Sequence, residues 1–191
     1  MTPPLILASA SPRRRELLSL LGVPFTVEVS RADEAAEGNG AQRVLAIAEQ
    51  KGREVFARFP ASAVLAADTL VCLHGRCLGK PRDEADAARM LRSLSGEWHD
   101  VYTGVCLLLP DGRHWTQYDG TRVHFLPLSE KEIAAYIATG EPMDKAGAYA
   151  VQGIAGAFID RVEGSVSNVI GLPLTLTRQL LYEASLPVLG A

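Results

Sequence analysis

Residues 5–18 have the sequence LILASASPRRRELL, which predicts the unit from which the fold starts. Leu5 to Ala8 form a short apolar run of the kind that makes a buried strand. Ser11 is a favourable N-cap residue, and Pro12 fits the first position of a helix, where its missing N–H group costs nothing. The stretch therefore predicts a strand, a tight turn and a helix, with hydroxyl groups and arginines gathered at the turn.

The rest of the chain repeats both kinds of pattern. Apolar or alternating runs predict strands at residues 25–29, 63–73, 101–109, 114–118, 121–126 and 157–162. Apolar stripes at helical spacing predict helices at about residues 41–56, 83–94, 129–139 and 173–184. Pro110-Asp111-Gly112-Arg113 is a turn signal inside an antiparallel meander. Because strand–helix units and a meander occur together, we expect an α/β fold with a mixed sheet.

The composition is that of a globular protein. The chain has 191 residues, of which 48% are hydrophobic and 21% charged,. This length predicts a single domain over residues 1–191, either compact or with two lobes. The net charge is −3, from 19 basic and 22 acidic residues. Since nonspecific nucleic-acid binders are usually basic, we expect no nucleic-acid partner, although a local basic pocket needs only a few charges.

The apolar residues are not arranged for membrane insertion or export. No apolar run approaches the ~20 residues needed to span a bilayer. The run from Pro3 to Ala10 is short for a signal peptide, and a basic cluster follows it instead of preceding it,. We expect a cytoplasmic protein with no membrane partner, and buried free thiols at Cys72, Cys77 and Cys106. The oligomeric state stays open between a monomer and a homodimer.

The turn before the first helix is a candidate phosphate site. Helix N-termini bind anions through unpaired backbone N–H groups. Ser9 and Ser11 add hydroxyl donors, and Arg13 and Arg14 add planar guanidinium groups suited to phosphate. Arginines at this end oppose the helix dipole, and a local rule broken in this way often marks a functional site. The alternative is that the arginines are solvated and that Ser11 only caps the helix.

Asp68 is a second candidate, because it interrupts a strand that is otherwise apolar. Burying a carboxylate is costly unless it is paired or binds a metal ion or a proton. Asp68 is therefore a natural metal ligand or general base. Thr69 beside it offers a hydroxyl group. The alternative is an aspartate at a strand end that caps a turn.

Three lysines stand in settings that suit a phosphate ligand. Lys80 lies in Gly-Lys-Pro-Arg-Asp and Lys145 in Asp-Lys-Ala-Gly-Ala-Tyr, whereas Lys51 lies near the middle of a predicted helix. The small and loop residues around Lys80 and Lys145 let a ligand approach the backbone. Taken singly, each lysine is most simply a surface residue. Taken with the arginines of the first turn, they can surround a polyphosphate.

Two acidic residues and one amide complete the candidates. Asp33 and Glu34 lie in a polar loop, where an acid could complete a magnesium site because hard cations prefer carboxylate oxygen. A solvated loop is the alternative. Gln152 lies in a stretch of small residues, and its amide could read a base edge through paired donor and acceptor groups.

A set of short motifs occurs in order over nearly the whole chain. The first motifs are LILASASPRR at 5–14, ADT at 67–69, GKP at 79–81 and DKAGAY at 144–149. They are followed by QG at 152–153, GS at 164–165, Asn168, and GLPL at 171–174. In this order, the set resembles the Maf family of nucleoside triphosphate pyrophosphatases. The resemblance implies a two-lobed α/β fold with a cleft over a bent mixed sheet, related to the inosine triphosphate pyrophosphatases. It also implies metal-dependent hydrolysis between the α and β phosphates of a nucleoside triphosphate.

The resemblance suggests roles for the catalytic candidates. Asp68 matches the family's proton acceptor. We expect Lys51 and Lys80 to add positive charge beside it, and Mg²⁺ or Mn²⁺ to be held by Glu34 and Asp68. Because Asp33 precedes Glu34, two residues compete for one acidic role, which leaves the identity of the metal ligand open.

The resemblance also suggests the substrate. Arg13, Thr69 and Gln152 match positions that look like the substrate-selecting set of the dTTP/UTP branch, and residues 144–152 are similar to that branch. We therefore expect dTTP and UTP as substrates. One mild departure is Ala10, where a glycine is common. A pyrophosphatase for 7-methyl-GTP and a nucleotide-binding regulator of septum formation with little catalysis remain the alternatives.

Overall fold

The fold begins with the predicted strand, turn and helix. In the computed structural model, which describes residues 2–189, β1 (Leu5–Leu7) runs through a tight turn into α1 (Pro12–Ser19). The side chain of Ser11 caps α1 by accepting a hydrogen bond from the backbone N–H of Arg14. The local signals of the opening stretch are therefore sufficient to set its structure.

A mixed sheet forms the centre of the molecule, as predicted. Within residues 2–189 it has seven strands in the order β2-β1-β3-β5-β6-β7, with β4 beside β3. Its remaining strands are β2 (Phe25–Val27), β3 (Ala63–Leu73), β4 (Arg76–Leu78), β5 (Trp98–Leu108), β6 (His114–Phe125) and β7 (Ile159–Glu163). Strand β1 is parallel to β2 and β3, whereas the other pairs are antiparallel.

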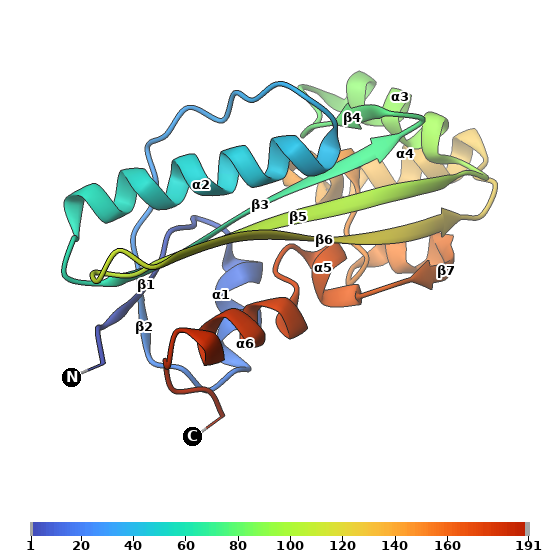
Figure 1. The fold of residues 1–191 in the computed structure, drawn as a ribbon. Coiled ribbons are helices and arrows are strands. Elements are labelled where there is room, and N and C mark those ends of the chain that lie inside the picture. The colour runs from blue at the N-terminus through green and yellow to red at the C-terminus, as the bar shows by residue number, and fades with distance from the viewer. Residues whose placement is uncertain (1, 190–191) are drawn as a thin grey trace.

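Helices cover both faces of the sheet (Figure 1). The remaining α-helices are α2 (Gly40–Arg58), α3 (Glu84–Leu94), α4 (Glu130–Ala138), α5 (Val166–Ile170) and α6 (Leu174–Glu183), and the 3-10 helices are η1 (Glu141–Asp144), η2 (Ala146–Ala148) and η3 (Ile154–Phe158). The long helix α2 packs on one face, and α1 and α6 pack on the opposite face. Helices α3 and α4 share a separate apolar core with the far end of the sheet. The middle of β3 lies between these groups of helices.

Two expectations from the sequence are wrong in detail. The predicted break between residues 118 and 121 is absent, and β6 runs unbroken through Gly120. Gly120 is paired with Tyr102 on β5, and a Cβ atom added at Gly120 would lie 3.3 Å from the Tyr102 ring. An aromatic neighbour can supply the packing that a glycine lacks in a strand, so the strand continues.

The cysteines also differ from expectation. Cys72 and Cys77 are direct cross-strand partners in the β3–β4 hairpin and form a disulfide, whereas Cys106 is a buried free thiol. The register of the hairpin brings Cys72 and Cys77 together, and the spacing of the two cysteines in the sequence does not predict this disulfide. The short helix α5 and the 3-10 helices were likewise not predicted.

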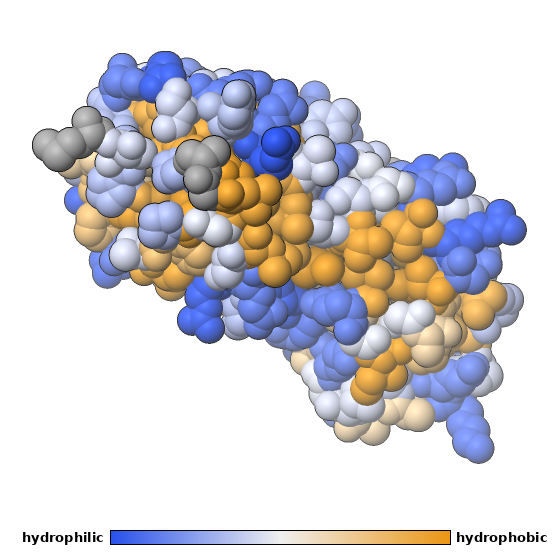
Figure 2. All heavy atoms as spheres, turned by 90° about the horizontal axis from the view of Figure 1, so that it is seen from below, coloured by the Kyte–Doolittle hydropathy of each residue, from blue (hydrophilic) through white to orange (hydrophobic). Residues whose placement is uncertain are grey.

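The underside of the molecule carries a broad area of apolar residues (Figure 2). Leu20 follows α1 and is 66% exposed, and Tyr182 on α6 is 71% exposed. Both helices lie on this side of the sheet in Figure 1. No helix within residues 2–189 is long and apolar enough to cross a membrane.

Candidate active site

A cavity of about 520 Å³ opens over the middle of the sheet. This volume lies in the usual range for small-molecule sites. Of the residues proposed for the site from the sequence, all but Asp33 line it: Ser9, Ser11, Arg13, Arg14, Glu34, Lys51, Asp68, Thr69, Lys80, Lys145 and Gln152. These residues come from the β1–α1 turn, the start of α1, the loop before α2, α2 itself, β3, the loop after β4, and the segments on either side of η2. The fold thus collects side chains that are far apart in the sequence.

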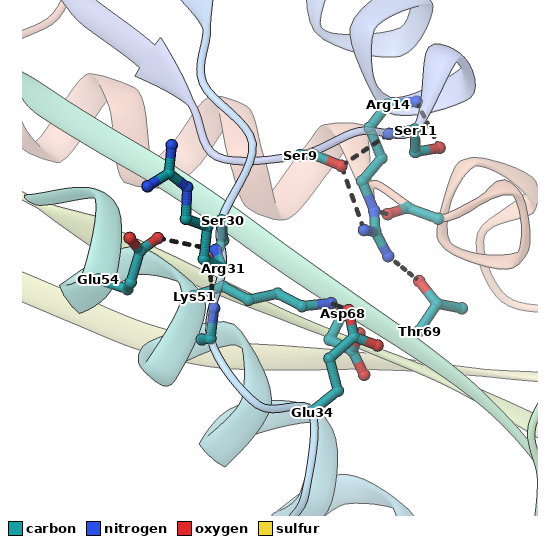
Figure 3. Close-up of polar contacts among 12 residues, drawn as sticks. Ser9, Ser11, Arg14, Ser30, Arg31, Glu34, Lys51, Glu54, Asp68 and Thr69 are labelled. Carbon is teal, nitrogen blue, oxygen red and sulfur yellow. Dashed lines mark hydrogen bonds and ion pairs between the residues drawn. The ribbon is translucent and has the colours of Figure 1, made fainter.

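Two carboxylates and one ammonium group form the acidic part of the cavity (Figure 3). Asp68 lies in the middle of β3 and is 7% exposed. Lys51 reaches it from α2, with Nζ 2.8 Å from Asp68 Oδ1 and 2.8 Å from Glu34 Oε1. The predicted alternative of a turn cap is therefore wrong for Asp68, which is a buried carboxylate paired with a buried ammonium group.

The structure separates the two neighbouring loop acids. Both acids are exposed, but Glu34 lines the cavity, whereas Asp33 is not among the described residues that line it. Partial burial acts to raise the pKa of Glu34, but the hydrogen bond and charge of Lys51, with the charges of Lys80 and Arg14, lower the pKa below its usual value. Glu34 is therefore ionised at neutral pH and faces the same ammonium group as the buried aspartate.

Arg14 lies deep in the cavity and binds protein groups from three segments. Its Nε donates to the carbonyl of Gly171 at 2.8 Å, Nη2 to Thr69 Oγ1 at 3.0 Å, and Nη1 to Ser9 Oγ at 3.4 Å. Burial lowers the pKa of Arg14, and the charges of the two cavity carboxylates oppose this shift. Arg14 therefore orients the hydroxyl groups of Ser9 and Thr69 as well as adding charge to the wall (Figure 3).

Asp144 is a residue that sequence reasoning missed. Its carboxylate accepts from Arg13 Nη1 at 3.3 Å and also pairs with Lys145. Burial acts to raise the pKa of Asp144, but hydrogen bonds from Lys145 and Arg13 lower it. Two of the predicted phosphate-binding cations thus share one partially exposed carboxylate. Its position beside Lys145 in the DKAGAY motif is the sequence signal that could have identified Asp144.

Arg43 was also missed. It lines the cavity from α2, and its Nε is buried without a hydrogen-bond partner within residues 2–189. Arg43, Ile47 and Lys51 recur every four residues along α2, and all three line the cavity. Residues four apart share one helix face, so a search from Lys51 along its own face would have found Arg43.

The two cavity carboxylates offer oxygen ligands of the kind that hard divalent cations prefer,. The described residues contain no group of three or more His, Cys, Asp or Glu side chains able to hold a metal ion. Asp68 and Glu34 nevertheless direct oxygen atoms to one point, at which both contact Lys51 Nζ. Mg²⁺ is usually bound through one or two carboxylates together with substrate phosphates, so this pair of ligands suits it.

Two solved structures have a fold similar to that of this protein. It is similar to the structure of the Staphylococcus aureus Ham1 protein, with a TM-score of 0.56 and 13% identity over 94% of this chain and 98% of that one. A HAM1 protein from Coxiella burnetii gives a TM-score of 0.52 and 14% identity over 96% of this chain and all of that one. At such low identity these likenesses concern the fold alone.

The sequence comparison is more specific. The family model described as Maf-like protein matches residues 4–184, and the chain belongs to this family. A dTTP/UTP pyrophosphatase of Anaeromyxobacter sp. (strain Fw109-5) is 52% identical, over 96% of this chain and 91% of the relative. Another from Deinococcus radiodurans is 47% identical, over 98% of this chain and 96% of the relative. The family resemblance inferred from the motifs is therefore confirmed.

Proposed function

We propose that this protein is a nucleoside triphosphate pyrophosphatase that hydrolyses dTTP and UTP to the monophosphate and pyrophosphate. One observation carries the proposal: the buried carboxylate of Asp68 faces a cavity whose walls are rich in cations. Such a site suits a substrate with several phosphates and a water molecule that must lose a proton. Relatives of about 50% identity with the name dTTP/UTP pyrophosphatase support the choice of nucleotides.

The triphosphate binds at the cationic wall. Backbone N–H groups at the start of α1 and the hydroxyl group of Ser9 donate to phosphate oxygens. Arg13, Lys80 and Lys145 line the same cavity and neutralise phosphate charge,. Arg14 acts chiefly by holding Ser9 in place, because its guanidinium group is bound to protein oxygens. This arrangement fixes the α-phosphorus opposite Asp68.

Asp68 takes a proton from the attacking water. It is buried, so few water molecules compete for its oxygens, and Lys51 holds it in one orientation through the 2.8 Å ion pair,. We propose that Glu34 and Asp68 bind Mg²⁺ or Mn²⁺ with the phosphates, and the ion supplies charge neutralisation at the α-phosphorus. Lys80 adds charge that favours departure of pyrophosphate. The scheme needs no covalent enzyme intermediate.

A second set of cavity residues, which shares Arg13 with the phosphate-binding set, selects the base. Gln152 carries an NH₂ group that donates and an amide oxygen that accepts, and together they can pair with the edge of a pyrimidine. Thr69 offers a hydroxyl group whose position is set by Arg14 at 3.0 Å. Arg13 completes this set from the start of α1. Selection by paired hydrogen bonds disfavours bases that would leave a donor or an acceptor unpaired.

Asp68→Asn tests the proposed mechanism. The amide cannot take a proton from water, so pyrophosphate release with Mg²⁺ should fall on the order of 10²- to 10⁴-fold. Binding of dTTP, measured by calorimetry, should be largely kept. Asp111→Asn, in the exposed β5–β6 turn, is the matched control and should behave like the unchanged protein. Near-normal turnover by Asp68→Asn would remove Asp68 from the mechanism.

A panel of substrates tests the proposed activity. The unchanged protein should release pyrophosphate from dTTP and UTP faster than from purine nucleotides or 7-methyl-GTP, each measured with Mg²⁺ and after chelation. Tight nucleotide binding with no pyrophosphate release would contradict an enzymatic role. It would favour instead a nucleotide-binding regulator.

A further inference from the structure

We propose that Glu141 is a positioning residue for nucleotide selection, which holds the loop that carries Gln152. The inference rests on the proposed function, in which Gln152 pairs with the base. Glu141 itself is absent from the described residues that line the cavity. It therefore acts through the loop and not by touching the nucleotide.

The carboxylate of Glu141 receives three hydrogen bonds. Two come from the backbone N–H groups of Ile154, at 3.0 Å to Oε2, and Ala155, at 3.4 Å to Oε1. The third comes from the hydroxyl group of Tyr136, at 2.9 Å to Oε1. Ile154 and Ala155 begin η3, whose own N-cap residue Gly153 provides no side-chain cap. Glu141 thus supplies, from a distant segment, the cap that this helix lacks.

Glu141 approaches the loop so closely that a side chain at Gly153 would displace its carboxylate. A Cβ atom at Gly153 would lie 2.5 Å from Glu141 Cδ, which is closer than real atoms allow. Gly153 directly follows Gln152, and its N–H donates to the carbonyl of Ala150 at 3.0 Å. The backbone around Gln152 is therefore fixed on its C-terminal side by the carboxylate and closed by a turn on its N-terminal side.

The support behind Glu141 is rigid. Tyr136 lies on α4, is 2% exposed and packs edge-on against Phe158 with ring centres 5.4 Å apart. The same segment also holds a cation of the cavity, because the carbonyl of Glu141 accepts a hydrogen bond from Lys145 Nζ at 3.2 Å. One residue thus connects a buried helix with two side chains that are proposed to contact substrate.

Loss of the Glu141 contacts should change the selectivity between nucleotides as well as the stability of the protein. A side chain that reads a base edge must be held within about 0.5 Å of its productive position. Gln152 is exposed and receives no hydrogen bond that would fix its side chain within residues 2–189. The contacts that constrain Gln152 are therefore those of its backbone, and that backbone is tied to Glu141 through Ile154.

Glu141→Gln tests the inference. The amide keeps the size of the side chain, but its NH₂ group faces donors where the carboxylate accepted. The ratio of kcat/KM for dTTP to that for dGTP should fall about tenfold, because a misplaced pairing group loses discrimination. Gln152→Ala should lower the same ratio, and adding Glu141→Gln to it should lower the ratio no further. Glu130→Gln is the control. Glu130 lies on α4, the helix that carries Tyr136, and its carboxylate accepts two hydrogen bonds from Arg92 outside the cavity.

The outcomes separate the inference from the function on which it rests. If Gln152→Ala lowers the ratio and Glu141→Gln only lowers the melting temperature, Glu141 is a structural cap and the inference is wrong. If Gln152→Ala leaves the ratio unchanged, the base-selecting role of Gln152 fails, and the inference fails with it. If Glu141→Gln does not fold, Tyr136→Phe removes one of the three bonds and keeps the ring, and a smaller fall in the ratio is then expected.

Discussion

His99 is a buried histidine next to the cavity wall, and its ionisation should make the protein sensitive to acid. It lies on β5, is 2% exposed, and its Nε2 is 2.8 Å from the hydroxyl group of Tyr149, which lines the cavity. The rings of Phe125 and Tyr149 pack edge-on against it at 5.3 Å. Burial lowers the pKa of His99 from 6.5 to about 4. The folded protein therefore holds this imidazole neutral.

The sign and size of the effect follow from this pKa. Because the folded pKa lies below the unfolded one, protonation favours the unfolded chain, and stability present above pH 6.5 is lost as the pH falls toward 4. The full shift from 6.5 to about 4 corresponds to about 3 kcal/mol of unfolding free energy,. Between pH 7.5 and pH 5, the expected loss from this group is about 2 kcal/mol.

Urea denaturation of His99→Gln at both pH values isolates the contribution. Loss of ring packing should destabilise the variant equally at each pH, so this cost cancels in the difference. The pH-dependent loss should be smaller in His99→Gln than in the unchanged protein by about 2 kcal/mol. His114→Gln, at an exposed position on β6, should leave the difference unchanged. An equal loss in the unchanged protein and in His99→Gln would refute the reasoning.

Three further changes test the cavity and its support. Lys51→Met leaves Asp68 buried without its partner, so the free energy of unfolding should fall by about 3 kcal/mol or more in urea denaturation, and a stability equal to that of the unchanged protein would contradict the buried pair. Arg43→Ala removes a cavity cation whose Nε has no hydrogen-bond partner within residues 2–189. It should raise KM for dTTP about tenfold, with an unchanged KM excluding phosphate contact. Gly104→Ala places a Cβ atom 2.5 Å from a backbone carbonyl carbon of α2. It should cost about 2 kcal/mol in thermal denaturation, unlike Gly79→Ala, which meets open space,.

Much of the fold follows from signals that act over a few residues. The strand, turn and helix at the start of the chain, and the helix predicted at residues 129–139, appear as the sequence predicts. These features depend on hydrogen bonds and packing between near neighbours, which the sequence displays directly. Asp68 was recognisable for the same reason, because a carboxylate among apolar residues has an energetic cost that needs a partner.

Contacts between distant residues were not predictable in this way. Tyr102 across the sheet keeps β6 unbroken at Gly120, and the hairpin register joins Cys72 to Cys77. Neither pairing leaves a pattern within its own segment. Each depends on which strands become neighbours and in what register.

The sequence by itself determined the family, the mixed α/β class and most of the polar residues that gather at the cavity, because their types and order are legible along the chain. Only the tertiary structure decided which partner each of their side chains binds. It turned Arg14 toward Gly171, 157 residues away, joined Arg13 to Asp144, 131 residues away, and placed Glu141 behind the loop of Gln152. Such partners meet only once the helices have packed on the sheet, and the packing depends on the whole core and not on any one segment.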